Sequence, residues 1–216
     1  MFITFEGGEG SGKSSCARAV VETLRLRGID VTHTREPGGS PGAEDIRRLL
    51  VEGEPGRWSA ETELLLFTAA RRDHLEKTIR PALDRGAIVI CDRFVDSTRA
   101  IQGAARAASR PMVDTLHASM ISFDPHLTLI LDCDPRIGLA RTTARMGVAA
   151  AETRFEKMGA EFHDRVRAGF LEIAAAEPGR CRIIDATQDA ATVLGQALGI
   201  IEDRIQARPE GMGLSS

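Results

Sequence analysis

Short apolar runs alternate along the chain with longer stretches of helical periodicity. The segments that read as strands, most of them apolar, cover residues 2–5, 30–34, 87–92, 127–132 and 181–185. Between them, apolar residues recur every three or four positions, which is typical of amphipathic helices. This alternation predicts an α/β domain with one parallel five-stranded sheet, right-handed crossovers and helices on both faces.

The predicted helices lie between these runs. They cover about residues 13–27, 41–51, 59–83, 97–108, 111–122, 135–145, 155–176 and 190–205. Ser59 is placed to cap the third helix, and Pro81 predicts a kink near its end. Residues 1–205 therefore form one predicted domain, and residues 206–216, rich in Gly, Ser and Pro, are expected to be a disordered tail.

A glycine-rich loop follows the first predicted strand and has the spacing G-x-x-x-x-G-K-S. Glycine lets the backbone N–H groups of such a loop close around phosphate oxygens, and the next helix adds its positive N-terminus. Lys13 is expected to reach the β- and γ-phosphates, and the Ser14 hydroxyl is expected to bind Mg²⁺. The predicted nucleotide-binding residues are Gly7, Gly8, Glu9, Gly10, Ser11, Gly12, Lys13, Ser14 and Ser15.

Polar residues also follow the other predicted strands. In parallel α/β sheets, ligands bind at the carboxyl ends of the strands. That rule brings the phosphate loop (residues 7–14) together with residues 35–39, Asp92, Arg93 and the turn at 185–188. Arg93 is a candidate clamp for the phosphate of an acceptor, although Asp92 and Arg93 could also form a purely structural ion pair.

Composition narrows the class of protein. The 216 residues carry a net charge of −3 and no basic stripe, which argues against a nucleic-acid polymer as partner. The four cysteines form no C-x-x-C pair, so they are expected to be buried, inert thiols in a reducing compartment. No apolar run approaches 18 residues and no signal peptide precedes the first strand, so we expect no membrane partner and a cytoplasmic location.

A phosphate loop alone is shared by kinases, motor ATPases and switch GTPases. The GTPase motifs D-x-x-G and N-K-x-D do not occur in this sequence, and a small chain with a separate acceptor pocket favours a small-molecule kinase. Two alternatives stay open on the residues alone. One is a kinase of another nucleoside monophosphate or a small metabolite, and the other is a nucleotide-binding switch module without turnover.

Four further motifs accompany the phosphate loop in a fixed order. They are Thr34-Arg35-Glu36-Pro37-Gly38-Gly39, Asp92-Arg93-Phe94, Ser97-Thr98 with Gln102-Gly103, and Asp185-Ala186-Thr187-Gln188. With them, the chain resembles bacterial thymidylate kinases from about residue 1 to 205. The resemblance implies a P-loop NTPase fold, three-layer α/β/α with strand order 2-3-1-4-5, and a short lid at about 142–155. It also implies phosphorylation of dTMP to dTDP by ATP with Mg²⁺, in a homodimer.

The resemblance also assigns roles to residues. Phe67 matches the aromatic that stacks on thymine, although periodicity alone would place it in the core. Arg71 matches the arginine that hydrogen-bonds the base, and Asp92 is expected to orient Mg²⁺ through water. The implied substrate-binding residues are Glu36, Pro37, Phe67, Arg71, Arg93, Ser97, Thr98, Ile101 and Gln102, with Glu9 near the acceptor sugar or phosphate.

Members of this family differ in where they carry a further catalytic arginine. Some have it in the phosphate loop, where this chain has Gly10, and others have it in the lid. The resemblance therefore implies that Arg154, supported by Arg145, joins Lys13 and Arg93 as a catalytic cation. The alternative is that both lid arginines are solvated helix charges.

Ile101 departs from the family pattern. Many relatives have a tyrosine there, packed against the deoxyribose where a ribose 2′-hydroxyl would lie. An isoleucine blocks that position sterically but offers no hydrogen bond. We therefore expect weaker discrimination against ribonucleotides than in relatives that carry the tyrosine.

Overall fold

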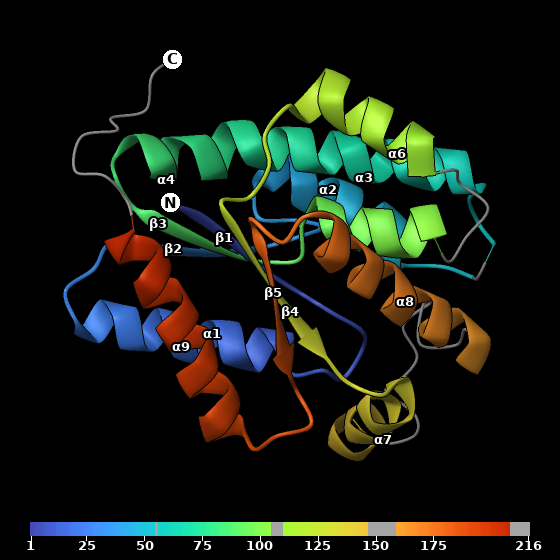
Figure 1. Ribbon diagram of the computed structural model, residues 1–216. Coiled ribbons are helices and arrows are strands. Elements are labelled where there is room, and N and C mark those ends of the chain that lie inside the picture. The colour runs from blue at the N-terminus through green and yellow to red at the C-terminus, as the bar shows by residue number, and fades with distance from the viewer. Residues whose placement is uncertain (55, 105–109, 147–158, 208–216) are drawn as a thin grey trace.

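The computed structural model of the protein describes residues 1–54, 56–104, 110–146 and 159–207 (Figure 1). Its sheet has the order β2-β3-β1-β4-β5, and every neighbouring pair is parallel. The strands are β1 (Phe2–Glu6), β2 (Val31–Arg35), β3 (Ile88–Asp92), β4 (Leu127–Asp132) and β5 (Cys181–Asp185). The predicted fold class and strand order are confirmed.

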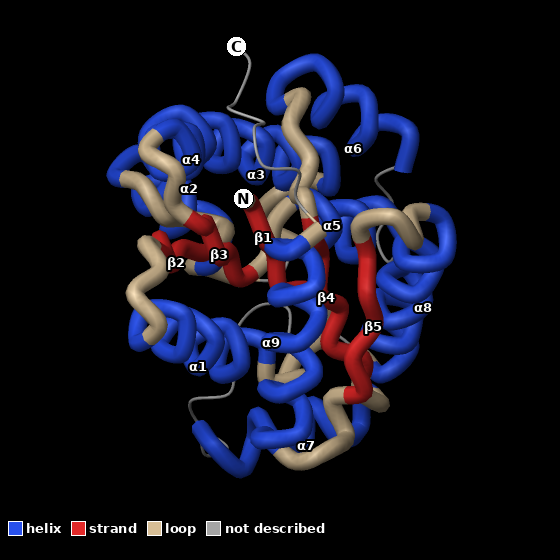
Figure 2. Tube along the Cα trace, turned by 60° about the vertical axis from the view of Figure 1, so that its left-hand side comes forward, coloured by secondary structure: helices blue, strands red, loops and turns tan. Residues whose placement is uncertain are grey.

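Helices cover both faces of this sheet (Figures 1 and 2). One face carries α1 (Lys13–Leu26) and α9 (Ala190–Gln206), and α7 (Pro135–Met146) follows the carboxyl end of β4. The opposite layer comprises α2 (Pro41–Val51), α3 (Ala60–His74), α4 (Arg80–Asp84), α5 (Val95–Thr98), α6 (Arg110–Leu116) and α8 (Ala160–Ala176). Three π-helical segments complete the described helical structure: η1 (Leu75–Ile79), η2 (Arg99–Ala104) and η3 (His117–Ile121).

The alternation of side chains along β1 builds a core on each face of the sheet. Ile3 and Phe5 pack with α1 and α9, while Phe2 packs with η1, α4 and Phe94 on the other face. Because successive side chains of a strand point to opposite faces, a strand that is covered on both sides reads as a continuous apolar run. This packing fixes the carboxyl ends of β1 and β3 side by side, with Phe5 opposite Asp92.

The long helix predicted at 59–83 is divided by η1. Its start is as predicted, since the Ser59 hydroxyl accepts a hydrogen bond of 3.1 Å from the Thr62 N–H. Near the end, the Arg80 N–H donates to the carbonyl of Leu75, five residues back. Pro81 explains the wider turn, because its ring lacks an N–H and clashes with the carbonyl four residues earlier. The helix predicted at 97–108 is replaced by α5 and η2 up to residue 104, and 105–109 lie outside the described residues.

Other predictions fall partly outside the described residues. The predicted lid begins within α7, but its residues 147–155 are not described, and neither is the predicted tail beyond residue 207. All four cysteines are free and buried, and burial raises the pKa of the Cys16 thiol to about 11. Among the helices that the structure describes, none has the length and apolar character needed to cross a membrane.

Candidate active site

The phosphate loop (residues 7–14) joins β1 to α1 and packs against the start of α7. Gly10 has φ +68°, and a Cβ built on it would lie 1.8 Å from the carbonyl oxygen of Gly138 in α7. This backbone therefore has no room for the loop arginine that some relatives carry at this position. Lys13 donates from Nζ to the carbonyl of Gly8 at 2.7 Å, and burial lowers the pKa of Lys13.

Ser14 and Asp92 meet at the carboxyl ends of β1 and β3. The Ser14 hydroxyl donates to Asp92 Oδ2, and Asp92 Oδ1 is buried without a hydrogen-bond partner among the described atoms. Mg²⁺ prefers oxygen ligands and keeps several waters when it binds nucleotide phosphates. A hydroxyl beside a carboxylate with an unused oxygen fits such an ion. No cluster of three or more His, Cys, Asp or Glu that could hold a metal occurs within the described residues.

Arg93 follows β3 and turns back toward the phosphate loop. Its φ is +71°, which is rare for a residue with a side chain. Nη2 donates to Glu9 Oε1 at 2.6 Å, and Nη1 donates to Ser97 Oγ at 2.9 Å. The carboxylate paired with Arg93 is thus Glu9, and not its neighbour Asp92. The charge of Arg93 holds the pKa of Glu9 down at about 2.

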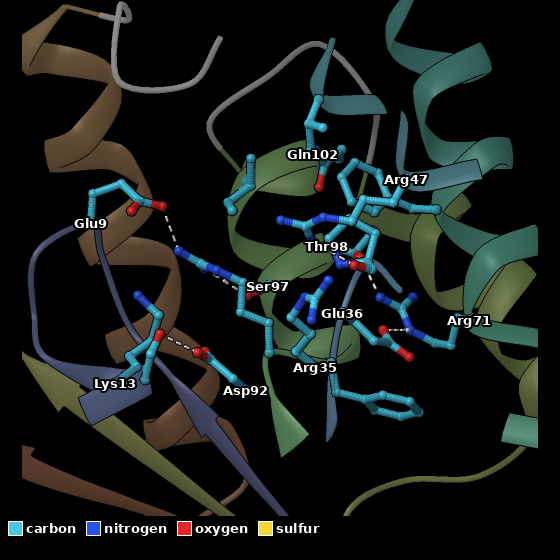
Figure 3. Close-up of a pocket in the computed structure, with 17 residues that line it drawn as sticks. Glu9, Lys13, Arg35, Glu36, Arg47, Arg71, Asp92, Ser97, Thr98 and Gln102 are labelled. Carbon is cyan, nitrogen blue, oxygen red and sulfur yellow. Dashed lines mark hydrogen bonds and ion pairs between the residues drawn. The ribbon is translucent and has the colours of Figure 1, made fainter. Parts of the chain in front are cut away.

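A cavity of about 290 Å³ opens beside these residues. Lys13, Asp92 and Glu9 lie at one end, and Arg71 and Glu36 lie at the opposite end (Figure 3). Its volume is near the lower end of the range of small-molecule sites, about 300–1,000 Å³. All nine predicted substrate-binding residues line it: Glu36, Pro37, Phe67, Arg71, Arg93, Ser97, Thr98, Ile101 and Gln102.

Arg71 is fixed on the wall of the cavity. Nε donates to Glu36 Oε2 at 2.8 Å, Nη2 donates to Thr98 Oγ1 at 2.8 Å, and the guanidinium lies over the Phe94 ring. Phe67 lies one helical turn earlier on α3, is half-buried and lines the same cavity. An aromatic ring and an oriented guanidinium, one helical turn apart on α3, therefore line the same cavity.

The sequence did not identify every residue of this cavity. Arg47 of α2 also lines it, donates to the carbonyl of Pro37 at 2.6 Å, and has its pKa lowered by burial. Val51 lies four residues after Arg47, on the same face of the helix, and lines the cavity too. The four-residue spacing of Arg47 and Val51 was the feature of the sequence that could have placed both in one site. Without the fold, an arginine on a helix is most simply interpreted as a solvent-exposed charge.

The lid arginines cannot be placed beside the cavity. Arg154 lies outside the described residues, and Arg145 lies in α7 with a side chain that is not described. Their catalytic roles therefore stay predictions. A buried histidine that the sequence did not single out, His163 of α8, lines a small cavity with Gly8 and Glu9, and its Nε2 has no hydrogen-bond partner within the described structure.

Comparison with known proteins gives a consistent result. The family model described as thymidylate kinase matches residues 5–196. The thymidylate kinase of Ruegeria pomeroyi is 58% identical over 201 residues, covering 93% of this chain and 94% of the relative. That of Caulobacter vibrioides is 52% identical over 205 residues, covering 94% and 97%. The crystal structure of thymidylate kinase from Ehrlichia chaffeensis has a TM-score of 0.75 at 35% identity, covering 94% of this chain and 98% of that one.

Proposed function

The chain belongs to the thymidylate kinase family, whose enzymes phosphorylate dTMP to dTDP with ATP in nucleotide biosynthesis, and we propose how its cavity serves that reaction. The dTMP phosphate lies between Arg93 and the phosphate loop, and the thymine ring lies between Phe67 and Arg71. The observation that carries this proposal is that one cavity joins the phosphate loop to α3, with Lys13 at one end and Arg71 at the opposite end (Figure 3) and with Arg93 and Phe67 among the residues that line it.

Transfer of the phosphoryl group depends mainly on positioning and on cations, because the transition state spreads negative charge over the transferred oxygens. We propose that ATP binds with its β- and γ-phosphates against the loop N–H groups and Lys13. The Lys13 ammonium then gives up its hydrogen bond to the Gly8 carbonyl and binds phosphate oxygens of ATP. Arg93 gives up part of its contact with Glu9 and binds the phosphate of dTMP. The donor phosphate and the acceptor phosphate therefore each face a cation before transfer.

We also propose that Ser14 and Asp92 hold Mg²⁺, with Asp92 acting through water. When bound, the ion neutralises charge on the ATP phosphates. The support comes from the donor set described above, a hydroxyl in contact with a carboxylate that has an unpartnered oxygen. We further propose, from the family resemblance, that Arg154 and Arg145 supply additional positive charge from the lid.

The assignment of the cavity is tested by ADP release with ATP-Mg²⁺ and a panel of acceptors. The panel is dTMP, dUMP, UMP, dCMP, dAMP and dGMP, with a reaction that lacks acceptor as the blank. We expect dTMP to give the highest kcat/KM. If a purine or cytosine monophosphate gives the highest value, the assignment of Phe67 and Arg71 to the thymine ring is wrong.

Truncating Phe67 to alanine is expected to weaken dTMP binding selectively. Stacking of a base on an aromatic side chain contributes about 1–3 kcal/mol, so the KM for dTMP should rise by about 5- to 150-fold. The KM for ATP, measured on the same preparation, is the internal control and should stay within about twofold, since Phe67 is remote from the loop. Equal increases in both KM values would contradict a stacking role.

Exchanging Ile101 for tyrosine is expected to sharpen the preference for deoxyribose. Ile101 lines the cavity between Thr98 and Gln102, and its aliphatic side chain rejects a 2′-hydroxyl by shape alone. Apolar pockets reject an added hydroxyl only modestly, so the ratio of kcat/KM for dUMP over UMP should rise by about tenfold in the variant. An unchanged or smaller ratio would show that Ile101 already discriminates as well as a tyrosine.

We propose a homodimer in the cytoplasm as the functional form. Leu65 of α3, Met112 of α6 and Met120 of η3 are exposed apolar side chains in the helical layer on the α3 and α6 side of the sheet. Such residues suit a partner surface, although single exposed apolar residues are also common on monomers. Sedimentation velocity on the purified chain tests the proposal, and a monomer at micromolar concentration would contradict it.

A further inference from the structure

A buried acid lies behind the proposed phosphate clamp. Glu6 is the last residue of β1, the central strand of the sheet, and its side chain is 0% exposed. Its Oε1 accepts a hydrogen bond of 2.7 Å from the Phe94 N–H, and its Oε2 accepts one of 2.5 Å from the Ser97 hydroxyl. Burying a carboxyl group is unfavourable unless such donors compensate it. The two groups that donate to Glu6 therefore indicate which part of the structure its carboxyl group holds in place.

Both donors belong to the segment that orients Arg93. Phe94 directly follows Arg93, whose φ of +71° is held only where the surroundings fix it. Ser97 has a single proton, which it gives to Glu6, and its oxygen accepts the hydrogen bond from Arg93 Nη1 at 2.9 Å. The carboxyl group of Glu6 thus holds the backbone on the C-terminal side of Arg93 and the hydroxyl on which its guanidinium rests.

We propose that Glu6 is a positioning residue for Arg93, which it aims at the acceptor phosphate through the Phe94 N–H and the Ser97 hydroxyl. The inference rests on the proposed function in one respect, namely that Arg93 holds that phosphate. Glu6 itself is separated from the cavity by Ser97 and does not line it. Its effect on the reaction therefore passes through the orientation of Arg93.

The position is unfavourable for a charge, which argues against a purely structural role. Burial, together with the charge of Asp96, raises the pKa of Glu6 to about 8. Because this pKa is raised above 4.5, the native state loses stability as the pH rises from 4.5 to 8 and the carboxyl ionises. The titratable groups that face Glu6 are Asp96 of α5, Arg93, Lys13 of α1, and the thiols of Cys91 and Cys181.

The substitution Glu6→Gln keeps the shape of the side chain and an acceptor for the Phe94 N–H, but it replaces the oxygen that accepts the Ser97 hydrogen bond with an amide NH2 group, which can only donate. We expect kcat/KM for dTMP to fall by about 10- to 100-fold, chiefly through KM, because displacements of about 1 Å in a site have effects of this size. The melting temperature at pH 8 should be equal to or above that of the unmodified protein. A structural role predicts the reverse, a loss of stability in parallel with the loss of activity.

A double-mutant cycle with Arg93→Ala tests whether Glu6 affects the reaction through Arg93 or independently of it. If Glu6 acts through Arg93, adding Glu6→Gln to Arg93→Ala changes kcat/KM by less than about twofold. If Glu6→Gln causes the same loss in both backgrounds, or none in the unmodified protein, the positioning role is wrong and the proposed function stands. If Arg93→Ala alone leaves the KM for dTMP unchanged, the proposed role of Arg93 is wrong, and the inference falls with it.

Two further variants complete the design. Thr4→Val is the matched control, because Thr4 is fully buried on the same face of β1, bonds to Thr128 and contacts neither Arg93 nor Ser97. Its kcat/KM should stay within about twofold of the unmodified value, because the hydrogen bond of Thr4 goes to Thr128 and not to Glu6, Arg93 or Ser97. Should Glu6→Gln not fold, Ser97→Ala takes its place in the cycle with the same two expected outcomes, because it removes the hydroxyl between carboxyl and guanidinium.

Discussion

Replacing Arg93 by alanine is expected to lower kcat/KM for dTMP by about 100- to 30,000-fold. Hydrogen bonds to a charged group contribute about 1.5–3 kcal/mol each, and two guanidinium nitrogens of Arg93 are turned toward the phosphate end of the cavity. Two such bonds total about 3–6 kcal/mol, and every 1.36 kcal/mol corresponds to a tenfold change. Loss of Arg93 also removes the largest positive influence on Glu9 and leaves its negative charge beside the incoming phosphate.

The measurement is steady-state turnover with dTMP varied at saturating ATP-Mg²⁺, and then with ATP varied. The KM for dTMP should carry most of the loss, with a smaller effect on the KM for ATP. Arg27→Ala is the matched control, because Arg27 is an exposed arginine that pairs with Glu202 on the far side of the domain. A loss of less than about fivefold for Arg93→Ala, which is about 1 kcal/mol, would contradict the clamp.

The same variant has a signature in stability that does not depend on activity. Arg93 lowers the pKa of Glu9 from 4.5 to about 2, so this pair contributes stability that is fully present above pH 4.5. The contribution is lost as the pH falls from 4.5 to 2. The difference in free energy of unfolding between the unmodified protein and Arg93→Ala should therefore be larger at pH 7 than at pH 3. A difference independent of pH would mean that Glu9 and Arg93 are not coupled.

The sequence predicted the elements that depend on local pattern. The three inner strands, β1, β3 and β4, are short apolar runs because helices bury both of their faces. The phosphate loop follows from the spacing of its glycines, Lys13 and Ser14. The order of the strands is not local information, and it came from the resemblance. The π-helical turn before Pro81 was also missed, because the proline predicts a distortion without specifying its hydrogen bonds.

In the site, too, the contacts that local sequence pattern could not predict are those between residues far apart in the chain. Asp92 and Arg93 are adjacent, which suggested an ion pair, but the carboxylate that meets Arg93 comes from Glu9, 84 residues earlier. Phe67 satisfies the helical pattern of a core residue equally well, so periodicity could not assign it. The resemblance pointed to the base, and the packing of α3 beside the cavity places Phe67 on the cavity wall. The position of Arg47 in the cavity depends on its hydrogen bond to the loop that contains Pro37, which the helical spacing of Arg47 and Val51 does not reveal.

Replacing Lys13 by methionine is expected to lower kcat by about 100- to 1,000-fold, the typical effect of removing one group that stabilises developing charge. Methionine keeps the length and apolar stem of the side chain and removes only the ammonium group. The KM for dTMP should change little, because the acceptor phosphate is assigned to Arg93. The KM for ATP should rise by less than the fall in kcat, since Lys13 acts most strongly on the charge that develops during transfer.

Lys77→Met is the control for this substitution, because Lys77 is an exposed lysine in η1 that pairs with Asp73. It should retain kcat within about twofold, as expected for a surface charge without contact to the cavity. The melting temperature of Lys13→Met should not fall, since burial is the largest influence on Lys13 and lowers its pKa despite the Gly8 carbonyl and the nearby charges of Glu9 and Asp92. If kcat survives and only the KM for ATP rises, Lys13 binds ATP in the ground state, and the stabilising charge must come from Arg93 and the lid.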